Sequence, residues 1–119
     1  MICLLDDEPS LLRALGRLLA SEGLTVERFS DSRHFLEYAR THPVQLAVID
    51  VRMPGRTGFE IMAELRTIAP DVRVIIMTGE NDSAHRSAAL TGGACAFFLK
   101  PFDDEKFLQA VREALAPTA

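Results

Sequence analysis

Five polar residues in this sequence come directly after short runs of apolar residues: Asp6, Asp7, Asp50, Thr78 and Lys100. Carboxylates brought close together repel one another unless a cation lies among them, and oxygen ligands with partial hydration are what Mg²⁺ prefers. A carboxylate beside Mg²⁺, with a lysine ammonium and a hydroxyl nearby, has the groups needed for phosphoryl transfer. These residue types therefore point to magnesium-assisted phosphoryl transfer, provided that the fold brings them together.

Asp50 suits the role of nucleophile, because it is the lone acid at the end of the central apolar run and a carboxylate can form an aspartyl phosphate. The adjacent pair Asp6 and Asp7 suits the metal. Lys100 can neutralise phosphoryl oxygens, and the Thr78 hydroxyl can donate a hydrogen bond to one of them. Each residue also has an ordinary explanation as a helix-start acid, a loop cap, a solvated lysine or a strand-end hydroxyl. The prediction rests on the ordered set.

Strands and helices alternate strictly along the chain. The predicted strands are residues 2–5, 24–29, 46–50, 72–77 and 96–99, with helices between and after them that begin near Pro9, Ser30 or Asp31, Thr57, Asn81 and Asp103. The run before Asp50 is apolar throughout, which indicates a strand buried on both faces, whereas the alternating second run indicates an edge strand. The polar fourth helix has the weakest apolar face and is expected to be the least firmly packed.

This order of elements predicts an α/β fold of right-handed βαβ units, with a parallel sheet covered on both faces. In a parallel sheet the carboxyl ends of the strands lie on one edge, where open α/β sheets bind their ligands. The five polar residues are therefore expected to converge on Asp50.

Four stretches resemble the signature of response-regulator receiver domains from two-component systems: Leu5-Asp6-Asp7-Glu8-Pro9, Val48-Ile49-Asp50-Val51-Arg52-Met53-Pro54-Gly55, Met77-Thr78-Gly79 and Phe98-Leu99-Lys100-Pro101-Phe102. The resemblance covers essentially the whole chain. It implies a single receiver domain over residues 1–119 with a three-layer, doubly wound, flavodoxin-like or CheY-like (βα)5 fold, whose parallel five-stranded sheet has the order 2-1-3-4-5.

By matching position, the resemblance also implies that Asp50 accepts a phosphoryl group from a phosphohistidine of a sensor histidine kinase. Asp7, Asp50 and the backbone carbonyl of Arg52 would bind Mg²⁺, with Asp6 acting mainly through water. Thr78 and Lys100 would bind the phosphoryl oxygens, and the peptide bond between Lys100 and Pro101 would be cis.

Phe97 falls where the family has its switching aromatic residue, so Thr78 and Phe97 would move inward together on phosphorylation. The alternative is that Phe97 belongs only to the core, since Phe98 adjoins it and one of the two must face inward. The face formed by the fourth helix, fifth strand and fifth helix would respond, and family behaviour suggests a homodimer through it.

Arg52 and Glu80 occupy the two positions that tune the lifetime of the aspartyl phosphate in this family. Their opposite charges could pair and hinder the attacking water, which predicts slow self-dephosphorylation. Solvated and unpaired loop charges are the alternative. An unchanged phosphate lifetime after Glu80→Ala would remove the first idea.

The sequence near Asp50 and Lys100 resembles that of receiver domains from nitrogen-fixation-type transcriptional regulators. Residues 116–119 are therefore expected to begin a linker to a DNA-binding domain that is absent here. A stand-alone receiver and a binding-only receiver are the alternatives. Apart from its own phosphorylation and dephosphorylation, no enzymatic activity is expected. A phosphatase of the haloacid dehalogenase type needs a second acid where Arg52 stands, and a nucleotide switch needs a GxxxxGK[ST] loop that the sequence lacks.

The composition of the chain argues against two other kinds of function. The net charge of −4 argues against direct nucleic-acid binding by this segment, and no apolar run approaches the length of a membrane span. Cys3 and Cys95 are expected to be buried reduced thiols of a cytoplasmic protein.

Overall fold

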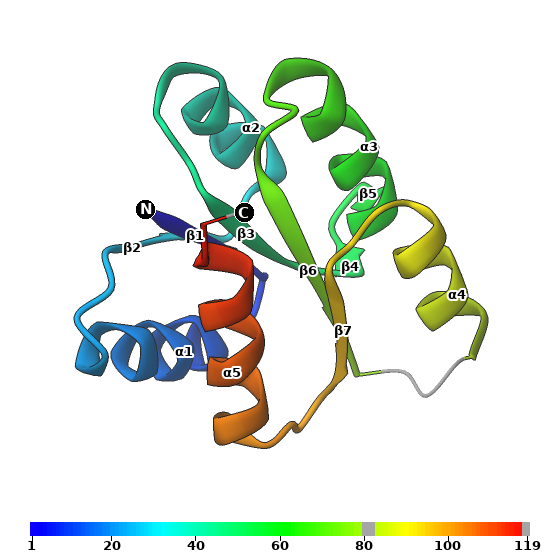
Figure 1. Cartoon of the computed structure of the whole chain (residues 1–119). Helices are drawn as coiled ribbons and strands as arrows, with labels where there is room; N and C mark the ends of the chain where they lie inside the picture. Colours follow the sequence, from blue (N-terminus) through cyan, green and yellow to red (C-terminus); the bar gives the residue numbers. More distant parts are fainter. Residues whose placement is uncertain (80–82, 118–119) are drawn as a thin grey trace.

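The apolar runs of the sequence form one parallel sheet of five strands, in the order β2-β1-β3-β6-β7 (Figure 1). The computed structural model describes residues 1–79 and 83–117. The strands are β1 (Ile2–Leu5), β2 (Val26–Phe29), β3 (Leu46–Asp50), β6 (Arg73–Thr78) and β7 (Ala96–Leu99). Counted over these five strands, the order is the predicted 2-1-3-4-5. Every residue of β1 and β3 is buried, because helices cover both faces of the sheet there.

In the part of the chain that the structure describes, five helices form the two outer layers: α1 (Pro9–Ser21), α2 (Ser32–Thr41), α3 (Gly58–Ile68), α4 (Ser83–Thr91) and α5 (Asp104–Leu115). Figure 1 shows α1 and α5 on one side of the sheet and α2, α3 and α4 on the other. Each layer has its own core. Phe107 of α5 is fully buried with the leucines of α1, and Phe35 of α2 is fully buried with Ile61 of α3. The three-layer architecture predicted from the alternation of elements is confirmed.

Local start signals place α1, α2, α3 and α5 in the predicted positions, whereas the start predicted near Asn81 lies outside the described residues. Pro9 lies in the first turn of α1, where its missing N–H costs nothing. The Asp31 carboxylate accepts hydrogen bonds from the backbone N–H groups of the first turn of α2, and Asp103 accepts one from Lys106 at the start of α5. Thr57 and Glu60 form the predicted capping box of α3.

Three features differ from the sequence-based expectations. The segment after Asp50 is a short antiparallel hairpin of β4 (Arg52–Met53) and β5 (Arg56–Thr57), where only a loop was expected. The second strand begins at residue 26, because Leu24 and Thr25 lie in the connection after α1, where the Leu24 N–H still donates to the Leu19 carbonyl oxygen. Cys95 is exposed, not buried, since it lies in the connection that leads into β7, whereas Cys3 is buried as expected.

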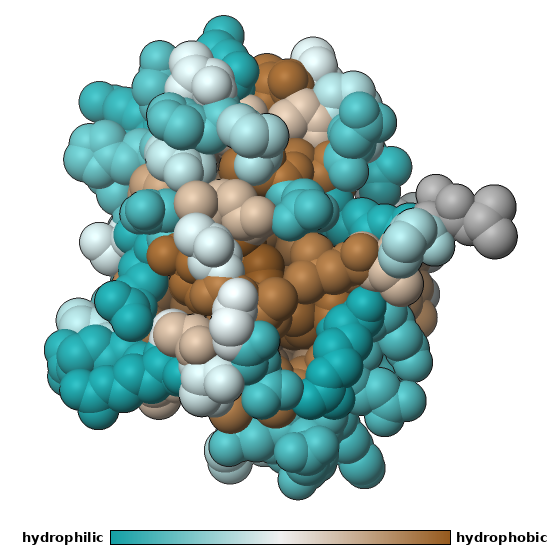
Figure 2. All heavy atoms as spheres, turned by 60° about the vertical axis from the view of Figure 1, so that its left-hand side comes forward, coloured by the Kyte–Doolittle hydropathy of each residue, from teal (hydrophilic) through white to brown (hydrophobic). Residues whose placement is uncertain are grey.

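The surface beside α1 and β2 has an apolar centre with polar flanks (Figure 2). Leu18, Leu24 and Val26 are partly buried apolar residues of this region. Glu27 and Arg28 are exposed on the outer strand β2, and charged residues on a short edge strand oppose pairing with another sheet. Among the described residues, none of the helices has the length and apolar character needed to cross a membrane.

Candidate phosphoryl-acceptor site

The carboxyl edge of the sheet brings together side chains that lie far apart in the sequence. The Lys100 Nζ lies 2.7 Å from Asp6 Oδ2 and 3.1 Å from Asp50 Oδ1. The Lys100 backbone N–H donates to the Thr78 carbonyl oxygen over 2.8 Å, which fixes the end of β7 beside the end of β6. The lysine therefore stands between two acids, as the positions of these residues at strand ends predicted.

These residues surround a hollow with a volume of about 380 Å³ at the edge of the sheet. It is lined by Asp7, Asp50, Arg52, Thr78, Gly79 and Lys100. Gly79 leaves open space there, because a Cβ at that position would meet no atom within 4 Å. Asp50 and Thr78 form the buried floor, with 5% and 1% of their surfaces exposed.

A larger hollow of about 570 Å³ lies between α2 and the β4–β5 hairpin. Its lining includes three arginines and three acids, namely Arg33, Arg40, Arg56, Asp31, Glu37 and Glu64. The charges balance, and no group of three or more metal-binding side chains was found there among the described residues. The side chains that line the smaller hollow, and not its volume, therefore identify it as the candidate functional site.

The environment of Asp50 disfavours its ionised form. Burial, together with the charge of the nearby Asp6 carboxylate, raises the pKa of the Asp50 carboxyl to about 6, although the charge and the hydrogen bond of Lys100 act in the opposite direction. Burial by itself lowers the pKa of Lys100, but its hydrogen bond to Asp6 and the charge of Asp50 outweigh that effect and raise it. Lys100 therefore stays charged, and Asp50 is left mostly ionised at neutral pH in an environment short of positive charge.

The donor set fits a hard divalent cation. Asp6, Asp7 and Asp50 each offer a carboxylate oxygen, and these atoms all lie within 4.8 Å of one another. Three carboxylates and one lysine leave an excess of negative charge, which a cation such as Mg²⁺ would neutralise. Oxygen-only donors of this kind are typical of Mg²⁺ sites and not of sites for softer metals.

Asp6 and Asp7 differ in how accessible their oxygens are. Asp6 is fully buried; its Oδ1 accepts a hydrogen bond from the Glu8 backbone N–H at 2.9 Å, and its Oδ2 pairs with Lys100. Asp7 is exposed and lines the hollow. This arrangement is compatible with the predicted direct role of Asp7 and the indirect role of Asp6.

Two further predictions concern β7 and the peptide bond that follows Lys100. The peptide bond between Lys100 and Pro101 is cis, as the resemblance implied. Phe97 is 7% exposed and packs with the α2–α3–α4 layer, while Phe98 contacts Phe102 and Phe107 on the opposite face. Both phenylalanines are thus covered, on different faces of β7, and the switching role of Phe97 stays a prediction.

Of the two residues predicted to tune the lifetime of the aspartyl phosphate, the structure describes Arg52. Arg52 is exposed in β4 and lines the hollow. Glu80 lies outside the described residues, so the idea that it pairs with Arg52 and slows dephosphorylation stays a prediction.

Sequence reasoning missed Gly58, which lies against the backbone of the phosphoacceptor candidate. A Cβ at residue 58 would lie 2.5 Å from the Asp50 carbonyl oxygen. The available signal was a glycine at the first position of α3, directly after the capping residue Thr57, where side chains are ordinarily tolerated. A glycine at this position indicates that another part of the chain lies close to the helix start, but the sequence does not identify that part.

The geometry agrees with what comparison of the sequence shows. Residues 2–112 match the model of the response regulator receiver domain. The chain belongs to this family. The resemblance stated from the sequence motifs is therefore confirmed.

Relatives of known function are similar to the chain over nearly its whole length. The response regulator protein TodT of Pseudomonas putida is 36% identical over 115 residues, which cover 97% of this chain and 51% of TodT. The transcriptional regulatory protein FixJ of Azorhizobium caulinodans is 36% identical over 115 residues, covering 97% of this chain and 54% of FixJ. The chain thus spans about half the length of these curated relatives.

Solved structures share the fold. The beryllofluoride-activated NtrC4 receiver domain dimer has a TM-score of 0.91 and 28% identity, covering 95% of this chain and 93% of that one. A response regulator protein from Burkholderia pseudomallei, with a phosphorylated aspartic acid, a calcium ion and citrate, has a TM-score of 0.84 and 25% identity, covering 92% of this chain and 64% of that one.

Proposed function

We propose that Asp50 is the phosphoacceptor of a two-component signalling domain. The observation that carries this proposal is the position of its carboxylate, which is buried at the carboxyl end of the central strand, 3.1 Å from the Lys100 ammonium and beside two further acids. A raised pKa at a cleft residue with specific charged neighbours is typical of functional sites.

The chain's own residues supply binding and orientation for the transfer. An ionised Asp50 oxygen forms a bond to phosphorus while the bond from phosphorus to the imidazole nitrogen of the donor breaks. The electron pair of that bond stays on the donor imidazole. The Lys100 ammonium, which lies 3.1 Å from Asp50 Oδ1, would neutralise the phosphoryl oxygens, and the Thr78 hydroxyl at the end of β6 would donate a hydrogen bond to one of them.

Asp7, Asp50 and the backbone carbonyl of Arg52 would hold Mg²⁺, with Asp6 contributing through water. When bound, Mg²⁺ neutralises the excess of carboxylate charge and the charge of the incoming phosphoryl group. The carboxylate cluster supports this assignment, because its oxygens lie within 4.8 Å of one another and include the acceptor itself.

The donor class we propose is a phosphohistidine of a sensor histidine kinase. The output we propose is transcriptional, through a DNA-binding domain attached after residue 119, because relatives such as TodT and FixJ carry regulator names and are about twice as long. Phosphorylation would act through Thr78 and Phe97 on the α4–β7–α5 face and favour a homodimer there. The exchange would take place in the cytoplasm, where the free thiols of Cys3 and Cys95 would stay reduced.

Beyond its own phosphorylation and dephosphorylation, we propose no enzymatic turnover for this domain. A receiver that signals by direct partner binding shares the same chemistry, so the acceptor test below does not depend on the choice of output.

Intact-protein mass after incubation with a small acyl phosphate tests the proposal. We expect one added phosphoryl group when Mg²⁺ is present, little without it, and none in Asp50→Asn. Asp31→Asn is the matched control, because it removes a carboxylate from the exposed cap of α2, and it should be phosphorylated like the wild type. An Asp50→Asn protein that still gains the phosphoryl group would overturn the assignment.

A further inference from the structure

The backbone of Gly58, the first residue of α3, touches the backbone of Asp50. A Cβ at residue 58 would lie 2.5 Å from the Asp50 carbonyl oxygen and 3.1 Å from both the Asp50 carbonyl carbon and the Cα of Val51. All three atoms belong to the main chain, so no side-chain rotation could relieve the contact. Only a shift of the Asp50–Val51 peptide or of α3 itself would make room for a side chain.

Gly55 and Gly16 do not share this constraint. Gly55, at the tip of the β4–β5 hairpin, has a φ of +77°, and a Cβ there would meet nothing within 4 Å. A Cβ at Gly16 in α1 would meet the guanidinium of Arg28, which is the far end of a flexible side chain. Gly58 therefore serves close approach to Asp50, whereas Gly55 serves a turn and Gly16 accommodates a movable group.

Gly58 also forms a backbone hydrogen bond that closes the segment carrying the candidate metal ligands Asp50 and Arg52. The Gly58 backbone N–H donates to the Val51 carbonyl oxygen over 2.8 Å, and the Val51 N–H donates to the Met77 carbonyl oxygen of β6 over 2.9 Å. Arg52 pairs with Thr57 across the hairpin. The path from Asp50 to the Arg52 carbonyl is thus held by β6 on one side and by Gly58 on the other.

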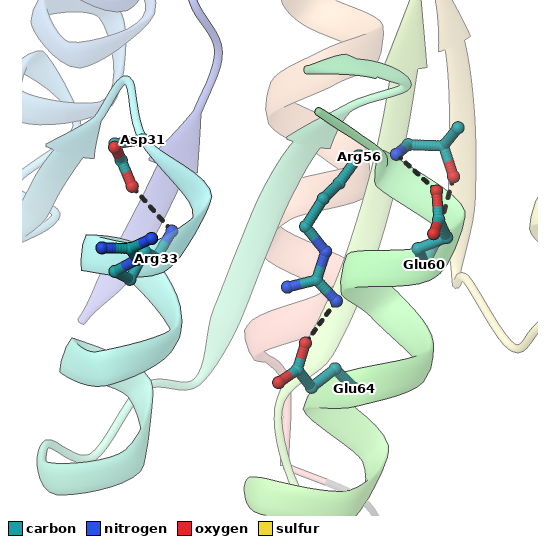
Figure 3. A network of polar contacts seen from close by, with 6 residues as sticks. Asp31, Arg33, Arg56, Glu60 and Glu64 are labelled. Atoms are coloured by element: carbon teal, nitrogen blue, oxygen red, sulfur yellow. Dashed lines mark hydrogen bonds and ion pairs between the residues drawn. The ribbon is translucent and has the colours of Figure 1, made fainter. Parts of the chain in front are cut away.

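Side chains in turn fasten the first turn of α3 to this hairpin (Figure 3). The Thr57 hydroxyl accepts from the Glu60 backbone N–H at 3.2 Å, and the Glu60 carboxylate accepts from the Thr57 N–H at 2.9 Å. Arg56 forms an ion pair with Glu64 one turn further along α3. Because this pair is about one-third exposed, it orients the hairpin more than it stabilises the fold.

We infer that Gly58 is a positioning residue for the phosphoacceptor site. By letting the capped end of α3 rest on the Asp50 carbonyl group, it sets where the Asp50 carboxylate and the Arg52 carbonyl stand relative to each other. A site that holds a metal and a reacting carboxylate needs its ligands placed to within about 0.5 Å. The inference rests on the proposed function, because it concerns how the same site acquires its geometry.

The first test is the Mg²⁺ affinity of Gly58→Ala, measured by titration of the folded protein with Mg²⁺ alone. Loss of a group that orients metal ligands weakens binding about 10- to 100-fold, and we expect a fall in this range. Gly16→Ala is the matched control: it adds the same methyl group to a buried glycine, against a movable side chain, and should leave the Mg²⁺ affinity unchanged. Circular dichroism and urea unfolding of both variants separate loss of fold from loss of positioning.

A second pair of variants covers the case in which Gly58→Ala does not fold. Thr57→Ala removes the cap of α3, and Asp31→Ala removes the cap of α2. Each should lower the midpoint of urea unfolding by a similar amount, because each loses one helix cap. Only Thr57→Ala should also lower the Mg²⁺ affinity, by less than Gly58→Ala would, because the end of α3 that supports Asp50 is loosened.

Two outcomes overturn the inference alone: a folded Gly58→Ala that binds Mg²⁺ and accepts phosphoryl groups like the wild type, or equal Mg²⁺ affinities for Thr57→Ala and Asp31→Ala. A wild-type protein that binds no Mg²⁺ and accepts no phosphoryl group overturns the proposed function, and the inference with it. The two failures are distinguishable because the second is seen without any substitution.

Discussion

Helices α3 and α4 pack on the same face of the sheet, yet they are held very differently. Helix α3 buries Ile61, Met62 and Leu65, and its first residue rests on the backbone of Asp50. Among the described side chains of α4, residues 84–91, only Ala89 is buried, and Leu90 is 50% exposed. The sparse apolar face of the fourth helix in the sequence predicted this weak packing.

Two of the described contacts of α4 involve aromatic rings of neighbouring elements. Arg86 places its guanidinium 5.1 Å from the centre of the Phe97 ring, and the His85 ring lies 5.6 Å from that of Phe59. A helix that contributes little to the core can shift at a small cost in free energy. The comparison suggests a division of labour, in which α3 fixes the geometry of the site and α4 responds to it.

The largest difference should appear in core truncations. Ile61→Ala removes a fully buried side chain from α3 and should lower the free energy of unfolding by about 2–5 kcal/mol. Leu90→Ala, on α4, should change it by no more than about 0.5 kcal/mol. Urea unfolding followed by circular dichroism measures both. Equal costs would break the comparison, because α4 would then be packed as firmly as α3.

An intermediate effect on the free energy of unfolding should come from removing the charge of Asp50, whose backbone contacts the start of α3. Asp50→Asn should raise the free energy of unfolding at pH 7.5 without divalent metal by about 1–3 kcal/mol, because the pKa of Asp50 is raised to about 6 by burial and by Asp6. Asp31→Asn is the control, since the backbone N–H groups of His34 and Arg33 lower the pKa of that exposed carboxyl, so no gain is expected.

The pH dependence of Asp50 follows with a definite sign. Its raised pKa means that the folded protein binds the proton more tightly than the unfolded chain between about pH 4 and pH 6. The stability linked to this group is complete below that window and is lost as the pH rises through about 6. Wild-type protein in a chelating buffer should therefore lose more stability between pH 5 and pH 7 than Asp50→Asn does. A greater loss in the variant would contradict the assigned environment.

A smaller effect than that of Asp50→Asn should come from Arg86→Gln, which removes the cation over Phe97 while keeping a long polar side chain. The stability should fall by about 0.5–1 kcal/mol, since a partly exposed cation–π contact contributes little. Hydrogen exchange should meanwhile quicken in α4 but not in α3, because only α4 loses a contact. Faster exchange in both helices would show that the two are coupled and would weaken the proposed division of labour.

Much of the site could be predicted from the sequence because it depends on strand ends. Asp6, Asp50, Thr78 and Lys100 each follow an apolar run, and a parallel sheet must bring such ends to one edge. The capping residues Asp31 and Thr57 were likewise readable, since caps act within one turn of the chain.

The features that the sequence did not predict depend on how the β4–β5 hairpin packs against α3 and on the conformation of the connection before β7. The approach of Gly58 to Asp50 and the ion pair of Arg56 with Glu64 follow from how the hairpin folds back onto α3, which has no periodic signal. The exposure of Cys95 was missed because its apolar neighbours suggested burial, although it precedes the strand that they form.

The most direct test of the central claim locates the phosphoryl group on the chain. After incubation with a small acyl phosphate and Mg²⁺, borohydride reduction converts a phosphorylated aspartate to homoserine, which peptide mass spectrometry then identifies by position. Our account predicts homoserine at residue 50 and at no other acidic position, with little formed when Mg²⁺ is withheld. Homoserine at Asp6 or Asp7, or a phosphorylated protein in which Asp50 is unmodified, would contradict it.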